Sequence, residues 1–162
     1  MRRRKNGILE EIFEKIAFFC KIAENFTSSG DGAAGGVGFT LRNFLKADLT
    51  SGAELVLDTV KFDEYLQNAD LVITGEGCSD GQTLCGKLPA VVAAHAAKAN
   101  VPAVLVSGAL GRDSEKLQDF FAAVFVLTDK PCTLDEAIKN TSTNLRRIAK
   151  SIASLLVTAK KQ

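Results

Sequence analysis

The stretch from Asp70 to Pro89, D-L-V-I-T-G-E-G-C-S-D-G-Q-T-L-C-G-K-L-P, constrains the fold more than any other part of the sequence. It opens with the apolar run 71–73, which suits a buried strand of a parallel sheet bounded by Gly75 and Gly77. A polar loop follows, and Pro89 then fits the first turn of a helix, where its missing N–H costs nothing. This order places polar side chains at the carboxyl end of a strand, where open α/β sheets bind their ligands.

Two further apolar runs predict strands, at residues 101–108 and 123–127. Helical patterns at 89–99 and 114–121 lie before and between them. Strands that alternate with helices predict the α/β class, a parallel sheet with right-handed crossovers and helices packed on it. Three strands make a small sheet for 162 residues, which raises the prospect of strands that this chain does not contain.

Helices are also predicted outside this alternation. Residues 8–25 read as an amphipathic helix, and residues 53–60 and 62–66 read as two short helices joined near Lys61. A capping box at 133–136 begins the last helix. Its apolar face is expected to contain Ile138, Leu145, Ile148, Ile152 and Leu155.

Composition suits one soluble domain, with 46% apolar residues, 24% charged residues and a net charge of +1. That balance creates no global field to attract nucleic acid or an anionic membrane, so neither is an expected partner. The basic residues 2–5 are expected to form a solvated tail, with a nucleic-acid arm as the alternative. We therefore expect a tail at 1–7 and one α/β portion at 8–162. No apolar run could span a bilayer, and no secretory pattern is present, so the expected location is cytoplasmic.

The four cysteines form no Cys-x-x-Cys pair, and His95 is the one histidine. A zinc site is therefore not expected, and the cysteines are expected to be reduced thiols. His95 lies among alanines within a predicted helix, where a packed histidine is expected rather than a catalytic one. Without a usable histidine or a Gly-x-Ser-x-Gly elbow, serine-type hydrolysis is not supported.

A glycine-rich segment, G-D-G-A-A-G-G-V-G, occupies residues 30–38 and leads into a helical pattern. Small residues there would let backbone N–H groups approach an anion, aided by the positive end of the helix. Its match to G-x-G-x-x-G is weak, because no strand precedes it and it lacks the Gly-Lys-Ser/Thr of a P-loop. Phosphate contact and tight helix packing stay equally open on these residues alone.

The loop after the first strand carries the groups that phosphoryl transfer needs. Glu76 and Asp80 could hold a metal or orient a hydroxyl, and Lys87 could stabilise phosphate charge. Taken one at a time, each residue also has an interpretation without a catalytic role. Glu76 and Asp80 could be solvated loop charges, Asp80 could instead be a helix N-cap, and Lys87 could be a surface lysine. Together on one strand-end loop they favour function.

These residues resemble a known family. The run I-T-G-E-G-x-x-D-x-Q-T-x-x-G-K-x-P at 73–89 is similar to the signature of the type I (bacterial) glycerate kinases, and so is the glycine segment at 30–38. The second strand, ending in G-x-L-G at 108–111, and the closing helix fit as well. The resemblance covers nearly the whole chain, from about Ile8 onward.

The resemblance implies a two-domain α/β enzyme that transfers the γ-phosphoryl group of ATP to D-glycerate with Mg²⁺. It implies that Asp80, Lys87 and Glu76 are catalytic and that Glu76 and Asp80 hold the metal. It also implies that the cofactor is bound by Gly32, Gly35, Gly36, Gly38 and Gly108. The chain resembles the C-terminal portion only, so the expected protein partner is the family's N-terminal part or a second copy of the chain.

Some residues depart from the family pattern. Cys78 and Cys85 replace residues that are usually polar or histidine, and Asp31 brings a negative charge into the glycine segment. These departures leave open a non-catalytic remnant or interaction module that keeps the fold without activity. A nucleotide-binding oxidoreductase module using residues 30–38 is a weaker third interpretation, because it needs a strand just before Gly30.

Overall fold

The computed structural model describes residues 28, 30–32 and 35–159. The chain divides into two compact units, residues 1–51 and 52–162. The helix predicted at 8–25 and the predicted tail at 1–7 lie outside the described residues.

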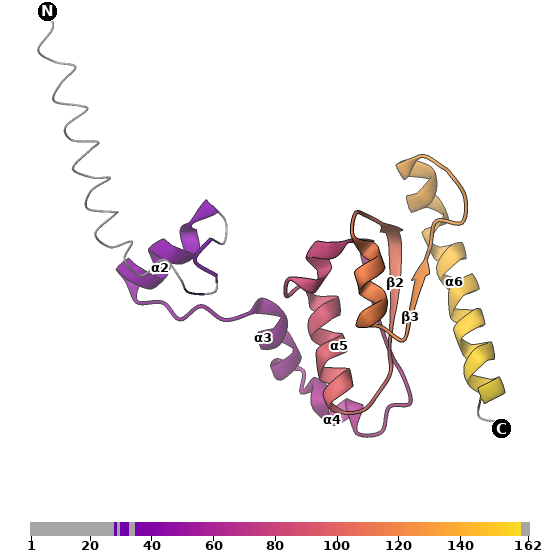
Figure 1. The fold of residues 1–162 in the computed structure, drawn as a ribbon, viewed down its shortest axis with the longest axis horizontal. Coiled ribbons are helices and arrows are strands. Elements are labelled where there is room, and N and C mark those ends of the chain that lie inside the picture. The colour runs from indigo at the N-terminus through magenta and orange to yellow at the C-terminus, as the bar shows by residue number, and fades with distance from the viewer. Residues whose placement is uncertain (1–27, 29, 33–34, 160–162) are drawn as a thin grey trace, which may run out of the picture. The chain divides into compact units, whose positions relative to one another are not determined.

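The second unit contains a parallel sheet with strand order β1-β2-β3 in the described part of the chain (Figure 1). The strands are β1 (Val72–Ser79), β2 (Ala103–Leu110) and β3 (Ala123–Val126). Both pairs of neighbours are parallel. The α/β class predicted from the sequence is therefore confirmed, with all three strands ending at the same edge.

The prediction that Gly75 and Gly77 bound the first strand is wrong, because β1 continues through both of them to Ser79. A Cβ atom added to Gly75 would lie 2.4 Å from the carbonyl oxygen of Val106, and one added to Gly108 would lie 2.3 Å from that of Gly77. The glycines thus let β1 and β2 approach each other instead of ending them. As a consequence, Glu76 projects from a strand and not from a loop.

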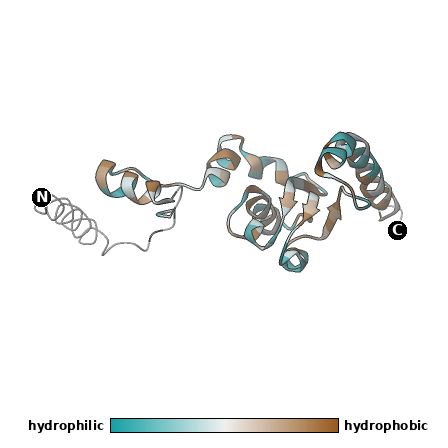
Figure 2. Ribbon diagram, turned by 90° about the horizontal axis from the view of Figure 1, so that it is seen from above, coloured by the Kyte–Doolittle hydropathy of each residue, from teal (hydrophilic) through white to brown (hydrophobic). Residues whose placement is uncertain are grey.

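Two apolar clusters cover the two faces of this sheet. On one face, α5 (Leu88–Lys98) packs with the 3₁₀ helix η4 (Ser114–Asp119) against a core that includes Leu105 and Leu117, both fully buried. On the other face, α6 (Leu134–Ala159) packs against the β2 and β3 side chains. Figure 2 shows mostly brown strands, whereas α6 carries both brown and teal residues. The region predicted as a helix at 114–121 forms, but as a 3₁₀ helix.

The apolar face predicted for α6 is only partly buried. Ile148 and Ile152 pack against the sheet, whereas Ile138 is 63% exposed and Leu155 is 64% exposed. The helix is 26 residues long, and β3, at four residues, is too short to cover it along its length. Among the described residues no helix is both long and apolar enough to cross a membrane.

Two short helices, α3 (Gly52–Thr59) and α4 (Phe62–Leu66), confirm the predicted break near Lys61, which adopts a left-handed conformation. His95 of α5 joins them. Its Nδ1 atom lies 2.6 Å from Asp63 of α4, and its Nε2 atom lies 2.8 Å from Glu54 of α3. These two carboxylates, Asp63 foremost, raise the pKa of His95 above its ordinary value. His95 is buried and holds helices together, as a packed histidine would.

The described residues of the first unit contain α2 (Val37–Leu45), which begins directly after Gly36. Gly35 and Gly36 have φ angles of 70° and 100°, the left-handed region that favours glycine. A Cβ atom on Gly38 would lie 2.1 Å from the carbonyl oxygen of Gly30. The glycines at these three positions are therefore explained by turn geometry and close packing.

Candidate functional site

The turn after β1 is fixed by a chain of hydrogen bonds. Asp80 caps the 3₁₀ helix η3 (Gly81–Leu84), and its Oδ1 atom accepts from the backbone N–H of Gln82 at 2.9 Å. The hydroxyl of Thr83, which is fully buried, accepts from the Asp80 N–H at 3.1 Å and donates to Glu76 Oε1 at 2.6 Å. Thr83 thereby connects the two carboxylate residues that the sequence singled out.

Lys87 completes the group, because its Nζ atom lies 3.8 Å from Asp80 Oδ1. The lysine side chain is 43% exposed and the aspartate side chain 33%, so both remain accessible to a ligand. Lys87 also stands immediately before α5, where Leu88 and Pro89 begin the helix. Asp80 is thus a helix N-cap, which was the alternative to a catalytic role, and it is also paired with Lys87.

The loops after β1 and β2 are joined to each other. The Gly111 N–H donates to the Ser79 carbonyl at 2.8 Å, and the Gly81 N–H donates to the Arg112 carbonyl at 3.0 Å. A Cβ atom on Gly111 would come within 3.0 Å of the Asp80 side chain. The loop that follows β2 therefore packs against Asp80 and helps to hold it in position.

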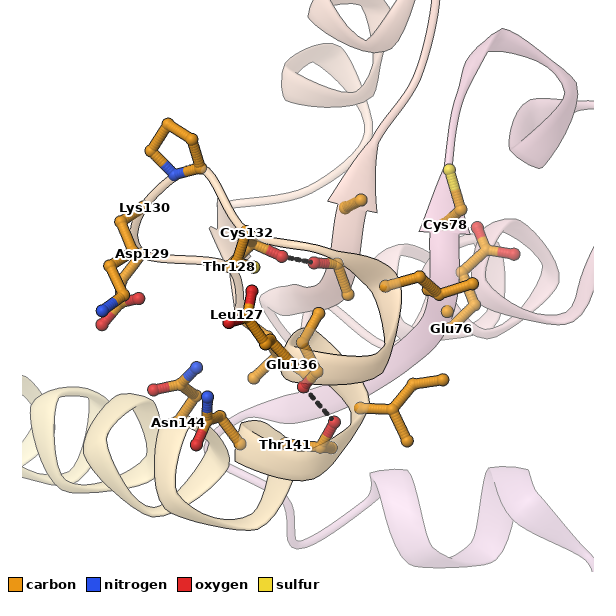
Figure 3. A pocket seen from close by; sticks show the side chains of 18 residues that line it. Glu76, Cys78, Leu127, Thr128, Asp129, Lys130, Cys132, Glu136, Thr141 and Asn144 are labelled. Atoms are coloured by element: carbon orange, nitrogen blue, oxygen red, sulfur yellow. Dashed lines mark hydrogen bonds between the residues drawn. The ribbon is translucent and has the colours of Figure 1, made fainter.

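A pocket of about 910 Å³ lies at the carboxyl ends of the strands, and residues 80–87 of the turn are not among those that line it. Glu76, Cys78 and Gly108 line it from β1 and β2 (Figure 3). In that view Glu76 and Cys78 lie on one side, and Asp129, Lys130 and Asn144 lie on the other. The pocket falls within the volume range of small-molecule and cofactor sites.

Of the predicted site residues, Glu76 and Gly108 line the pocket, and Asp80 and Lys87 lie on the turn that Thr83 ties to Glu76. The remaining wall, from the β3–α6 connection and α6, was missed by the sequence reasoning. Two signals could have shown it: Thr128 and Asp129 follow a strand end, and polar residues interrupt the apolar face of α6 at Thr141 and Asn144.

The pocket has an acidic character. Three carboxylate residues line it, Glu76, Asp129 and Glu136, against one cation, Lys130. Hydrogen bonds from the backbone and the hydroxyl of Thr133 hold the pKa of Glu136 below its usual range. The predicted capping box is confirmed by the same contacts, with Thr133 N and Glu136 Oε2 2.9 Å apart.

Asp31, in the glycine segment, is nearly buried and carries a compensated charge. Arg42 of α2 donates to its two oxygens from Nε at 2.8 Å and from Nη2 at 2.6 Å. These bonds hold the pKa of Asp31 below its usual range. The negative charge seen in the sequence is thus neutralised by a bidentate partner. The cofactor-binding role of Gly32, Gly35, Gly36 and Gly38 stays a prediction.

Within the described ranges, no group of three or more His, Cys, Asp or Glu side chains could hold a metal by itself. Mg²⁺ does not need one, because it is commonly bound by one or two carboxylates together with substrate phosphates. Glu76, on β1, and Asp80, on the turn after it, carry oxygen donors of this kind, and their binding of Mg²⁺ stays a prediction. Cys78, Cys85 and Cys132 are free, exposed thiols.

Comparison with known proteins gives a consistent match. The family model described as the glycerate kinase family matches residues 5–157. The glycerate kinase of Bacillus subtilis (strain 168) is 36% identical over 160 residues, which cover 94% of this chain and 42% of that relative. The glycerate 2-kinase of Escherichia coli (strain K12) is 40% identical over 128 residues, 78% of this chain and 34% of that relative.

A solved structure agrees with these sequences. The crystal structure of a protein described as glycerate kinase 2 from Salmonella typhimurium LT2 superposes with a TM-score of 0.61 at 37% identity, covering 87% of this chain and 37% of that one. The chain spans about two fifths of the length of the curated relatives that it matches. A family model that covers most of the chain, together with these relatives, shows that the chain belongs to the glycerate kinase family.

Proposed function

We propose that this chain supplies part of the active site of a glycerate kinase, which transfers the γ-phosphoryl group of ATP to D-glycerate. The observation that carries the proposal is the bonded series Glu76–Thr83–Asp80–Lys87 at the carboxyl end of β1. It combines two carboxylates and a cation at a strand end in a chain of this family. Phosphoryl transfer needs positioning and charge stabilisation more than covalent help from the protein.

Each residue in the series has a task that its contacts suit. Asp80, held by the Gln82 N–H and by Lys87, orients the acceptor hydroxyl and accepts its proton. Lys87 neutralises the charge on the transferred phosphoryl group and can reach it because its ammonium end is partly exposed. Thr83 fixes Glu76 in place.

Mg²⁺ would be held by Glu76 and Asp80 and would neutralise phosphate charge when bound with ATP. The carboxylate donors fit a hard cation that prefers oxygen ligands. Gly108 lines the pocket and is the proposed backbone contact for phosphate, but the space of its missing side chain is occupied by the Gly77 carbonyl oxygen.

The N-terminal part of the family is the proposed partner, with a second copy of the chain as the other expectation. One edge of β1 has no neighbouring strand among the described residues, and Ile73 on this strand is 55% exposed. Unpaired edges and exposed apolar side chains attract further chain. Both features support a sheet that is extended by protein outside this chain.

The test is a coupled assay of ADP release with D-glycerate, ATP and Mg²⁺. It is run on the 162-residue chain alone and after addition or fusion of the N-terminal part of the Bacillus subtilis glycerate kinase. We expect turnover only in the combined sample. Turnover by the chain alone would show that its own residues form a complete site. A combined sample that releases no ADP, although circular dichroism shows it to be folded, would contradict the proposal and favour a non-catalytic remnant.

A further inference from the structure

His95 is the one histidine of the chain, and both nitrogen atoms of its ring face a carboxylate. Nδ1 lies 2.6 Å from Asp63 Oδ1, and Nε2 lies 2.8 Å from Glu54 Oε2. A neutral imidazole has a single N–H, so one of its nitrogens would present a lone pair to a carboxylate oxygen. Only the imidazolium donates at both positions. The observed geometry therefore requires the charged ring.

The two contacts join separate parts of the second unit. Glu54 and Asp63 belong to α3 and α4, whereas His95 belongs to α5. Within the α3–α4 segment, residues 52–66, the backbone N–H groups of residues 60, 61 and 64 donate to carbonyls of the same segment. The contacts of His95 instead cross to another helix. Hydrogen bonds between an imidazolium and carboxylates are charge-assisted, and they are stronger than neutral ones.

Apolar packing of the α3–α4 segment is limited. Leu57 and Leu66 are its buried apolar side chains, at 6% and 3% exposure, whereas Leu55, Val56 and Tyr65 are each more than half exposed. Segments that bury few apolar side chains open locally at a lower free energy than the core strands do. The docking of this segment is therefore sensitive to the two polar contacts that His95 makes.

The surroundings of His95 are acidic. A small pocket of about 210 Å³ beside the ring is lined by the charged residues Asp58, Lys61, Asp63 and Glu64. Its one cation, Lys61, lies 3.3 Å from Glu64. The His95 side chain is 9% exposed, whereas those of Glu54 and Asp63 are 46% and 70% exposed. The hydrogen bonds from Asp63 and then from Glu54 raise the pKa of His95 in spite of its burial.

We infer that protonation of His95 controls the docking of α3 and α4 on α5, as a pH-dependent device within the second unit. With the ring charged, both carboxylates are bound and residues 52–66 are docked. Loss of the proton places a lone pair opposite one carboxylate, and the segment opens while the sheet stays folded. Opening exposes Leu57 and Leu66 to water. This inference is independent of the proposed kinase function.

The sign of the pH dependence follows from the direction of the shift. The pKa of His95 is higher in the docked state than the value of about 6.5 that an unperturbed histidine has. The stabilisation of the docked state is therefore complete below about pH 6.5 and is lost as the pH rises through the docked-state pKa. Between these two values the opening equilibrium increases by at most about tenfold per pH unit, because one proton is released.

The test combines two measurements on the full 162-residue chain. Because His95 is the one histidine, its imidazole NMR signals are assigned directly and give its titration midpoint. Hydrogen exchange with mass spectrometry, corrected for intrinsic rates, gives amide protection at 53–66 and, as an internal reference, at 103–106 of β2. We expect a midpoint above 6.5. Protection at 53–66 should fall through this midpoint, and that at 103–106 should not. In His95→Gln, protection at 53–66 should lose this pH dependence.

Two matched variants separate the contact from the general acidity of the pocket. Asp63→Asn removes the main partner of His95. Glu64→Gln changes the neighbouring acid, which lines the same pocket but pairs with Lys61. We expect Asp63→Asn to lower the His95 midpoint and Glu64→Gln to change it less. If His95→Gln does not fold, the wild-type titration and these two variants still decide.

Four results would overturn the inference. They are a midpoint at or below 6.5, equal changes of the midpoint in Asp63→Asn and Glu64→Gln, protection at 53–66 that falls only together with that at 103–106, and an unchanged pH dependence in a folded His95→Gln.

Discussion

Replacing Gly75 by alanine tests the strand pairing that positions Glu76. The new Cβ atom would lie 2.4 Å from the carbonyl oxygen of Val106, about an ångström short of ordinary contact. Backbone cannot rotate away as a side chain can, so β1 and β2 must separate or shift. Overpacking of this kind costs about 1–3 kcal/mol. For the second unit, residues 52–162, about 2 kcal/mol lowers the unfolding midpoint by roughly 9 °C.

Gly77→Ala is the matched control, because it lies in the same strand and its Cβ atom would meet nothing within 4 Å. This change should be neutral, or stabilise by about 0.4–1 kcal/mol through reduced freedom of the unfolded chain. Thermal and urea unfolding, followed by circular dichroism, measure both variants. Equal losses in the two, or no loss in Gly75→Ala, would refute the β1–β2 geometry.

Two further predictions concern buried polar groups. His95 gains a raised pKa on folding, so its contribution to stability is present below its unfolded pKa of about 6.5 and is lost as pH rises through the folded value. The unfolding free energy of the wild type, relative to that of His95→Gln, should therefore fall as pH rises, by at most about 1.4 kcal/mol per pH unit. Urea unfolding at several pH values measures both proteins. An equal pH dependence of the two unfolding free energies would contradict the contacts of His95 with Asp63 and Glu54. Thr83→Val removes the hydroxyl between Glu76 and the Asp80 N–H and should cost about 1–3 kcal/mol in urea unfolding, whereas Thr83→Ser, which keeps the hydroxyl, should lose less. Equal stability of the valine and serine variants would show that the hydroxyl does not hold the turn.

The sequence was sufficient for the order of elements in the second unit. Apolar runs and their flanking turns located β1, β2 and β3, and Pro89 and Thr133 marked two helix starts that the structure confirms. These signals are local, because capping and strand propensity depend on neighbouring residues. The end of β1 was predicted wrongly at Gly75, because a glycine that ends a strand and a glycine that lets a neighbouring strand come close cannot be distinguished by sequence.

The site was recovered only in part for a related reason. Glu76, Asp80 and Lys87 lie within one short segment, so their proximity could be read directly. The opposite wall comes from the connection after β3 and from α6, and it begins at Leu127, 40 residues after Lys87. Its placement depends on the sheet register and on the packing of Ile148. Likewise, the partners of His95 are 32 and 41 residues away, beyond the reach of local patterns.

The most direct test of the catalytic assignment compares two acid–lysine pairs in the combined enzyme. Asp80→Asn with Lys87→Ala changes the proposed catalytic pair, and asparagine retains the N-cap. Asp113→Asn with Lys116→Ala changes the neighbouring surface pair, whose charged atoms are 3.4 Å apart. We predict that the first double variant lowers kcat/KM for D-glycerate by about 10²-fold or more, and that the second leaves it within about twofold. Equal activity of the two, with both folded, would contradict the assignment.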